Sequence, residues 1–146
     1  MGHQNIRFGK WLIPVLLAFM GLAIFGSSQT VASDKDAEIR DTILRQIEAF
    51  ANNDQEQAWA HASEGIKRRF GSSQVFVDMV REAYPAVHNA TAIEFTQRLP
   101  HGAFEIQVVR LHGPEGKRWD AYYRMVLTEG AWKVAGVRLQ PAELGI

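Results

Sequence analysis

The chain has 146 residues, with 16 Lys and Arg against 16 Asp and Glu, and it contains no cysteine. The lack of cysteine excludes disulfides, thiolate nucleophiles and cysteine-ligated metals. The balanced charge argues against general nucleic-acid binding, which needs a basic face. The sequence also lacks a Gly-rich phosphate loop, a Gly-x-Ser-x-Gly elbow and a His-Glu-x-x-His zinc motif, so we predict neither a cofactor nor a metal site.

The N-terminal segment predicts where the protein works. Residues Trp11–Ser33 carry no charge and follow the basic residues Arg7 and Lys10. A basic start, an apolar run and an exit of small residues are typical of a secretory signal peptide. We therefore predict a signal peptide over residues 1–32, cleaved between Ala32 and Ser33, and a single domain over residues 33–146, whose formal charge is −2.

An uncleaved membrane anchor is the alternative for this segment. Its strongly apolar part, Trp11–Phe25, has 15 residues and includes Pro14, whereas a helix needs about 20 apolar residues to span a bilayer. Both alternatives place the domain outside the cytoplasm, because the basic residues stay on the cytoplasmic side. We predict an extracytoplasmic (periplasmic or secreted) location, with membrane attachment only if residues 1–32 are retained.

Three helices are predicted in the first half of the domain, because apolar residues recur there at helical spacing. The first is expected to begin at Asp34 or Asp36 and to end at Asn52–Asn53. The second begins at the capping residue Asp54 and stops near Gly65. A single turn over residues 66–70 precedes the third, which starts at Ser72 or Ser73 and ends before Pro85. The expected core-facing residues are Ile39, Ile43, Ile47, Ala58, Trp59, Phe76, Met79 and Val80.

After Thr91 the apolar residues alternate with polar ones, which predicts strands. Four strands linked by tight turns are expected near residues 91–99, 103–111, 118–127 and 132–139. Gly136 predicts a bulge in the last of them. The predicted fold class is α+β, with three helices packed on a curved, four-stranded antiparallel meander that forms a cone.

Several short motifs carry a resemblance to a known family. They are Ile47–Asp54, Ala58–Trp59, Arg69–Gly71, Phe76–Val80, Tyr84–Val87 and Trp132–Gly136. The chain resembles a bacterial family of unknown function within the nuclear-transport-factor-2-like superfamily, the cystatin-like cone shared by ketosteroid isomerase and scytalone dehydratase. The resemblance implies a pocket between the helices and the concave face of the sheet, and it implies no particular chemistry.

Enzymes of that superfamily place carboxylates, histidines or tyrosines inside the pocket as acid and base. Strand alternation here predicts only Gln97 and Tyr123 as inward polar residues. Asp120 and Glu94 are expected to point away, so no carboxylate dyad is predicted inside the cone. A buried Gln97 must find hydrogen-bond partners in the core, in water or in a ligand.

Three further residues are candidates for the pocket. Tyr84 and Trp59 belong to predicted helices, and His88 belongs to the loop before the sheet, where it could overhang the mouth of the cone. Each also has a simple structural interpretation, as a core aromatic or an exposed loop histidine. The basic run Lys67–Arg69 is interpreted as solvated surface rather than as a binding site for an anionic partner.

Two functions follow as hypotheses. The first is an exported, non-catalytic domain that binds a small apolar ligand or an envelope protein partner. The alternative is a lyase or isomerase acting on a small hydrophobic substrate through Tyr123, Gln97 and His88. A homodimer is also predicted, through an outer sheet face formed by Val109, Leu111, Tyr122 and Val126 and framed by Arg118 and Arg124.

Overall fold

The computed structural model describes the backbone of residues 27–143 and the side chains of residues 34–143. Four strands follow five helices, and they pair in the order β1-β2-β3-β4, all antiparallel. The helices are α1 (Ser27–Ala51), α2 (Gln55–Ala60), α3 (Glu64–Phe70), α4 (Ser73–Ala83) and α5 (Pro85–His88). The strands are β1 (Ala92–His101), β2 (Phe104–His112), β3 (Arg118–Thr128) and β4 (Ala131–Pro141).

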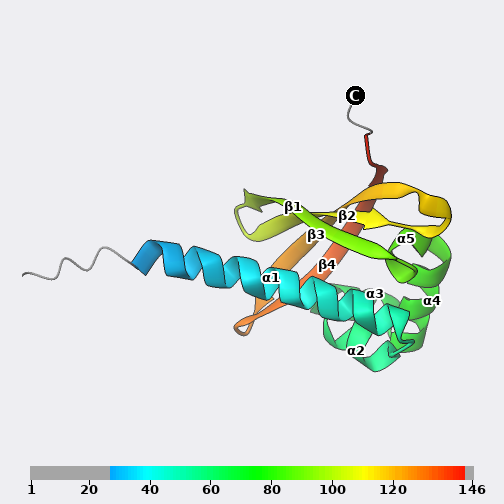
Figure 1. Cartoon of the computed structure of the whole chain (residues 1–146). Helices are drawn as coiled ribbons and strands as arrows, with labels where there is room; N and C mark the ends of the chain where they lie inside the picture. The colour runs from blue at the N-terminus through cyan, green and yellow to red at the C-terminus, as the bar shows by residue number, and fades with distance from the viewer. Residues whose placement is uncertain (1–26, 144–146) are drawn as a thin grey trace, which may run out of the picture.

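The predicted α+β class and the antiparallel meander are confirmed. In Figure 1 the long helix α1 runs beside the sheet, and the shorter helices gather at its C-terminal end. Within residues 27–143, no helix is both long enough and apolar enough to cross a membrane. The predicted signal peptide lies almost entirely outside the described residues, apart from the first residues of α1.

The helices differ from the prediction in number and bounds. Helix α1 begins at Ser27 rather than at Asp34 or Asp36. The predicted second helix ends at Ala60 instead of near Gly65, and the predicted single turn over residues 66–70 is the helix α3, which begins after Ser63, whose hydroxyl accepts a hydrogen bond from the backbone of Ile66. Proline fits the first position of a helix, so the residues after Tyr84 form the short helix α5 instead of a loop.

The segment between α2 and α3 is tied to the sheet. The backbone N–H of Ser63 donates to the carbonyl of Val134 at 2.8 Å, and the N–H of Val134 donates to the carbonyl of His61 at 2.9 Å. These two bonds make a short parallel bridge between Ala62 and Val134. Because they satisfy backbone groups that would otherwise be buried unpaired, they hold the start of α3 against β4.

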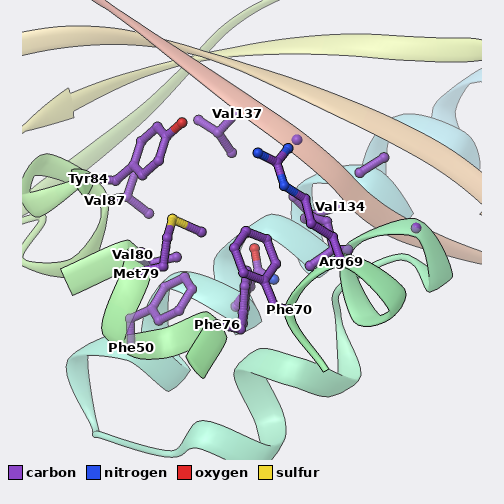
Figure 2. A pocket seen from close by; sticks show the side chains of 15 residues that line it. Phe50, Arg69, Phe70, Phe76, Met79, Val80, Tyr84, Val87, Val134 and Val137 are labelled. Atoms are coloured by element: carbon purple, nitrogen blue, oxygen red, sulfur yellow. The ribbon is translucent and has the colours of Figure 1, made fainter. Parts of the chain in front are cut away.

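Strand β4 contains the bulge that its glycine predicts. Arg124 of β3 pairs with Gly136 and Met125 pairs with Val134, so Ala135 is an extra residue without a partner. An extra residue changes the alternation of a strand. Val134 and Val137 therefore both face the helices, where Figure 2 shows them.

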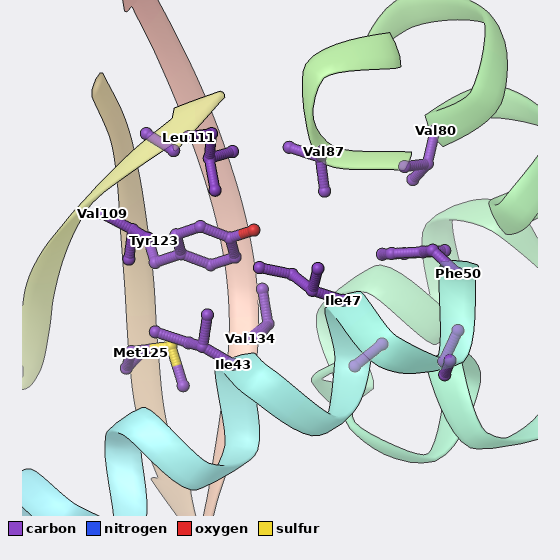
Figure 3. Packing of buried hydrophobic residues seen from close by; sticks show 14 of the residues in the cluster. Ile43, Ile47, Phe50, Val80, Val87, Val109, Leu111, Tyr123, Met125 and Val134 are labelled. Carbon is purple, nitrogen blue, oxygen red and sulfur yellow. The ribbon is translucent and has the colours of Figure 1, made fainter. Parts of the chain in front are cut away.

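The core lies between α1 and the inner face of the sheet (Figure 3). Ile39, Ile43 and Ile47 form one stripe of α1 and are at most 3% exposed. The sheet supplies the facing residues Val109, Leu111, Ala121, Tyr123, Met125 and Val134. Each fully buried aliphatic side chain contributes about 1.5–3 kcal/mol, so this contact is the main support of α1. The space beneath the centre of the sheet is filled.

Strand β1 has a bulge that the sequence analysis missed. Phe95 pairs with Val109 and Arg98 pairs with Gln107, so two residues of β1 lie opposite Val108 alone. The bulge exposes Gln97 and turns Arg98 toward the inner side. The prediction that Gln97 faces the interior is therefore wrong.

The buried glutamine of the sheet is Gln107 on β2. Its side-chain amide donates to the carbonyls of Gln97 and Val108, at 3.1 and 3.0 Å. The Gln107 amide thus satisfies the carbonyl of Gln97 in the bulge, and this carbonyl gives the buried amide a hydrogen-bond partner.

The two faces of β2 are the reverse of the prediction. Val109 and Leu111 were expected on the outer face, but both are 0% exposed and belong to the core. Apolar residues occur on both faces of this strand, since Phe104 and Ile106 lie on the outer face. Alternation alone therefore could not show which face of β2 is buried. In the fold, Val109 pairs with Ala121, and this pairing places Val109 on the inner face.

Candidate functional site

A cavity of about 300 Å³ lies between α3, α4, α5 and β4 (Figure 2). This volume is at the lower end of the range for small-molecule sites. Most of its walls are apolar, formed by Phe50, Ile66, Phe70, Phe76, Met79, Val80, Val87, Val134 and Val137. The cavity lies beside the filled centre of the core rather than beneath the middle of the sheet.

Helix α4 supplies one wall because its sequence is strongly amphipathic. The hydroxyl of Ser72 caps its start by accepting a hydrogen bond from the backbone of Val75. Phe76 and Val80 are buried on the inner side of this helix, with Met79 partly buried beside them. The result is a helix whose apolar face is divided between the core and the cavity.

Aromatic rings hold the floor of the cavity together. The ring of Phe76 lies 5.9 Å from the ring of Phe50 and 5.9 Å from the ring of Phe70, both in tilted arrangements. Tilted aromatic pairs at this spacing are favourable beyond their simple burial. Because the three rings come from α1, α3 and α4, they fix these helices relative to one another around the cavity.

Two polar side chains reach the rim of this apolar space. In Figure 2 the guanidinium of Arg69 and the hydroxyl of Tyr84 extend toward one another, with Val137 between them. The Arg69 guanidinium lies over the ring of Phe70, 5.5 Å from its centre. No described residue forms an ion pair with Arg69 or a hydrogen bond with the Tyr84 hydroxyl. Both groups are therefore available to a ligand.

Tyr84 is the one predicted candidate that lines this cavity. Tyr123 is 0% exposed and lies within the core (Figure 3). Burial raises the pKa of its phenol above the usual value, because a low-polarity environment disfavours the charged form. Its hydroxyl has no hydrogen-bond partner among the described residues. It is sealed from the cavity, so it is not placed to exchange protons with a ligand there.

The remaining candidates lie apart from the cavity. Gln97 is exposed on β1. His88 is buried in α5, not in a loop, with Nδ1 2.9 Å from the side-chain oxygen of Asn89 and its ring 6.0 Å from that of Phe50. Trp59 packs on Phe76, at 5.8 Å between ring centres. The structure therefore does not bring Tyr123, Gln97 and His88 together in one site.

A partly buried charged cluster lies at another place on the inner face, between β1, β2 and α1. Glu105 is 7% exposed and accepts hydrogen bonds from Lys35 at 3.1 Å and from Arg98 at 3.0 Å. Arg98 also pairs with Asp36. All four charges are matched, so the cluster holds α1 to the sheet and offers no free carboxylate. Across the described residues, no three His, Asp or Glu side chains are grouped closely enough to hold a metal ion.

Sequence reasoning missed Arg69 as a lining residue, because the run Lys67–Arg69 was interpreted as solvated surface. The signal for the cavity was nevertheless present. Phe50, Phe70 and Phe76 lie near the ends or starts of α1, α3 and α4, which predicts that they meet where those helices meet. The basic residue next to Phe70 then falls at the edge of that aromatic group.

Comparisons with known proteins support the fold. A family model described as "Domain of unknown function (DUF4864)" matches residues 32–144. The crystal structure of an NTF-2-like protein of unknown function from Silicibacter pomeroyi DSS-3 is similar, with a TM-score of 0.51 and 16% sequence identity. The match covers 76% of this chain and 98% of that one, and at this identity it shows the fold alone. No curated protein matches the chain.

Proposed function

Because the chain belongs to the DUF4864 family and has an NTF-2-like fold, we propose that it is a non-catalytic domain that binds a small apolar ligand. The ligand would occupy the cavity between α3, α4, α5 and β4. The family resemblance inferred from the sequence is confirmed by the family match, and the fold is confirmed by the structural match. The binding function is our proposal.

The apolar character of the cavity walls is the observation that carries this proposal. Ten of the 15 residues that line it are Phe, Ile, Val, Ala or Met, on α1, α3, α4, α5 and β4. Specific small-molecule sites are typically concave and apolar, with a few polar groups that orient the ligand. Arg69 and Tyr84 are polar groups of this kind at the rim.

The distribution of acids and bases favours binding over catalysis. Among the described residues, no carboxylate or histidine lines the cavity, and general acid–base catalysis requires a group within hydrogen-bond reach of the reacting proton. Of the three residues proposed for a lyase or isomerase, Tyr123 is sealed in the core, His88 is packed in α5 and Gln97 is exposed on β1. The enzyme hypothesis therefore lacks all three of its proposed residues at the place where a substrate would fit.

We also propose that the domain works outside the cytoplasm. The basic and apolar residues before Asp34 support this location. It remains a prediction of the sequence.

Titration with the neutral apolar fluorophore N-phenyl-1-naphthylamine tests ligand binding. We expect saturable fluorescence enhancement in the wild type and a loss of affinity of about tenfold or more in Val137→Phe, which adds a ring to the cavity. Val75→Phe is the matched control, because Val75 is on the exposed side of α4 at 52% exposure. Unchanged binding in a folded Val137→Phe protein, or no saturable binding in the wild type, would contradict the proposal.

A further inference from the structure

We infer that the ligand of this cavity is a small amphipathic carboxylic acid. Its apolar body would lie among the aromatic and aliphatic walls, and its carboxylate would bind Arg69 at the rim. This inference rests on the proposed function, and it further specifies that the ligand carries a negative charge. The argument depends on the geometry of Arg69, on the charges around it and on the shape of the space behind it.

Arg69 is held in a position to bind an anion. It lies in the last turn of α3, and its guanidinium lies over the ring of Phe70, an attractive cation–π contact. This contact does not use the guanidinium N–H groups as hydrogen-bond donors, so they stay free to donate. Those N–H groups match the two oxygens of a carboxylate. Figure 2 shows the guanidinium directed over the cavity toward Tyr84.

The charges near the rim are positive. Lys67 and Arg68 share the last turn of α3 with Arg69, and Glu64 pairs with Lys67 at 3.7 Å. Over the part of the chain that the structure describes, no acidic side chain lines the cavity and no carboxylate lies within ion-pair distance of Arg69. A positive field at the mouth of a low-polarity cavity attracts anions and repels cations. The hydroxyl of Tyr84 adds a second donor on the opposite side of the mouth.

The space behind Arg69 is suited to an apolar body. The floor is formed by Phe50, Phe76 and Val80, all of them buried core residues. A volume of about 300 Å³ accommodates one short chain or ring rather than a two-chain lipid. The site therefore combines an apolar interior with one cation at its opening, and the complementary ligand carries one anionic head.

Competition against bound N-phenyl-1-naphthylamine tests this inference. Decanoate, decanol and decylamine share one apolar chain and differ in charge, and each is titrated at neutral pH into the mature or full-length protein. We expect decanoate to bind about tenfold or more tightly than decanol, because a hydrogen bond to a charged group contributes at least this factor. We expect decylamine to bind more weakly than decanol.

Two substitutions on the same turn complete the experiment. Arg69→Gln should remove the preference for decanoate while leaving decanol binding unchanged. Arg68→Gln is the matched control, because Arg68 is exposed in the same turn but does not line the cavity, and it should keep the preference. Both sites are exposed, so neither change should impair folding.

The outcomes separate this inference from the proposed function. Equal binding of decanoate and decanol, or a preference that survives in Arg69→Gln, would overturn the anionic ligand and leave the apolar site intact. Failure of the fluorophore and of all three competitors to bind the wild type would overturn both.

Discussion

Tyr123 has a hydroxyl in the most deeply buried part of the core, without a partner among the described residues. Leaving a buried polar group unpaired costs about 1–3 kcal/mol. We therefore expect Tyr123→Phe to leave the free energy of unfolding unchanged or to raise it by about 1 kcal/mol, measured by urea denaturation. Tyr122→Phe, on the outer face beneath Arg138, is the control and should be nearly neutral.

A loss of more than about 1 kcal/mol in Tyr123→Phe would contradict this expectation, because it would show that the hydroxyl is hydrogen-bonded in solution. Such a loss would also make Tyr123 a candidate again for a hydrogen bond to a ligand or water in the interior. The sequence alone placed Tyr123 on the inner face correctly. It could not show whether that part of the interior is filled or open.

At the scale of the elements, the charged cluster of Lys35, Asp36, Arg98 and Glu105 adds to the apolar contact that attaches α1 to the sheet. Replacing Glu105 by Gln leaves Lys35 and Arg98 without their shared, nearly buried carboxylate. Removing one partner of a fully buried pair costs about 3–5 kcal/mol. Lys35 is partly exposed and Arg98 keeps Asp36, so we expect a loss of about 1–3 kcal/mol in the free energy of unfolding.

Asp41→Asn provides the matched control for Glu105→Gln. Asp41 forms an ion pair with Arg45 on the same helix, and both side chains are more than half exposed. Exposed helical pairs contribute only about 0.3–0.5 kcal/mol. Equal effects of the two substitutions in urea denaturation would show that the cluster does not stabilise the docking of α1.

The elements also show which parts of the fold can be predicted from sequence. Asp54 and Ser72 cap helices where predicted, and Gly136 marks a bulge, because these signals act within a few residues. The bulge at Thr96 and Gln97 contains neither Gly nor Pro, so nothing local indicates it. It is determined by pairing with β2, and it decides that Arg98 rather than Gln97 turns inward.

The candidate site was less predictable than the fold, because it depends on contacts between segments far apart in the sequence. Tyr84 was named correctly as a residue that could line a cavity. The position of the cavity depends on the split between α2 and α3 and on the bridge from Ala62 to Val134, which joins segments 72 residues apart. Local sequence carries no information on such a contact, so the aromatic residues at the helix ends were the only indication of where Arg69 would lie.

For the whole molecule, we propose a homodimer through the outer face of the sheet. The predicted members Tyr122 and Val126 are on this face, whereas Val109 and Leu111 are in the core. Phe104 and Ile106 of β2 take their place. Arg124 lies over the ring of Phe104 at 4.7 Å and Arg138 over the ring of Tyr122 at 5.0 Å, so the face is apolar with stacked cations.

Light scattering of the domain over residues 33–146 at micromolar concentration should give twice its own mass. Ile106→Glu should give the monomer, because the interface would bury a carboxylate, and its attraction to Arg124, the residue opposite position 106 on β3, does not repay the cost of removing both charges from water. Val75→Glu is the control, since it places the same charge on an exposed apolar residue of α4, and it should keep the dimer. A monomeric wild type would contradict the proposal.

The walls of the cavity are also part of the core: Phe50, Phe76, Val80, Val87 and Val134 belong to both. Occupancy of the cavity and global folding are therefore linked thermodynamically, and a ligand at one hundred times its dissociation constant adds about 2.7 kcal/mol to stability. Empty molecules open more often and become the preferred substrates of proteases. The supply of ligand would thereby set the lifetime of the protein, so that its abundance follows that of the molecule it binds.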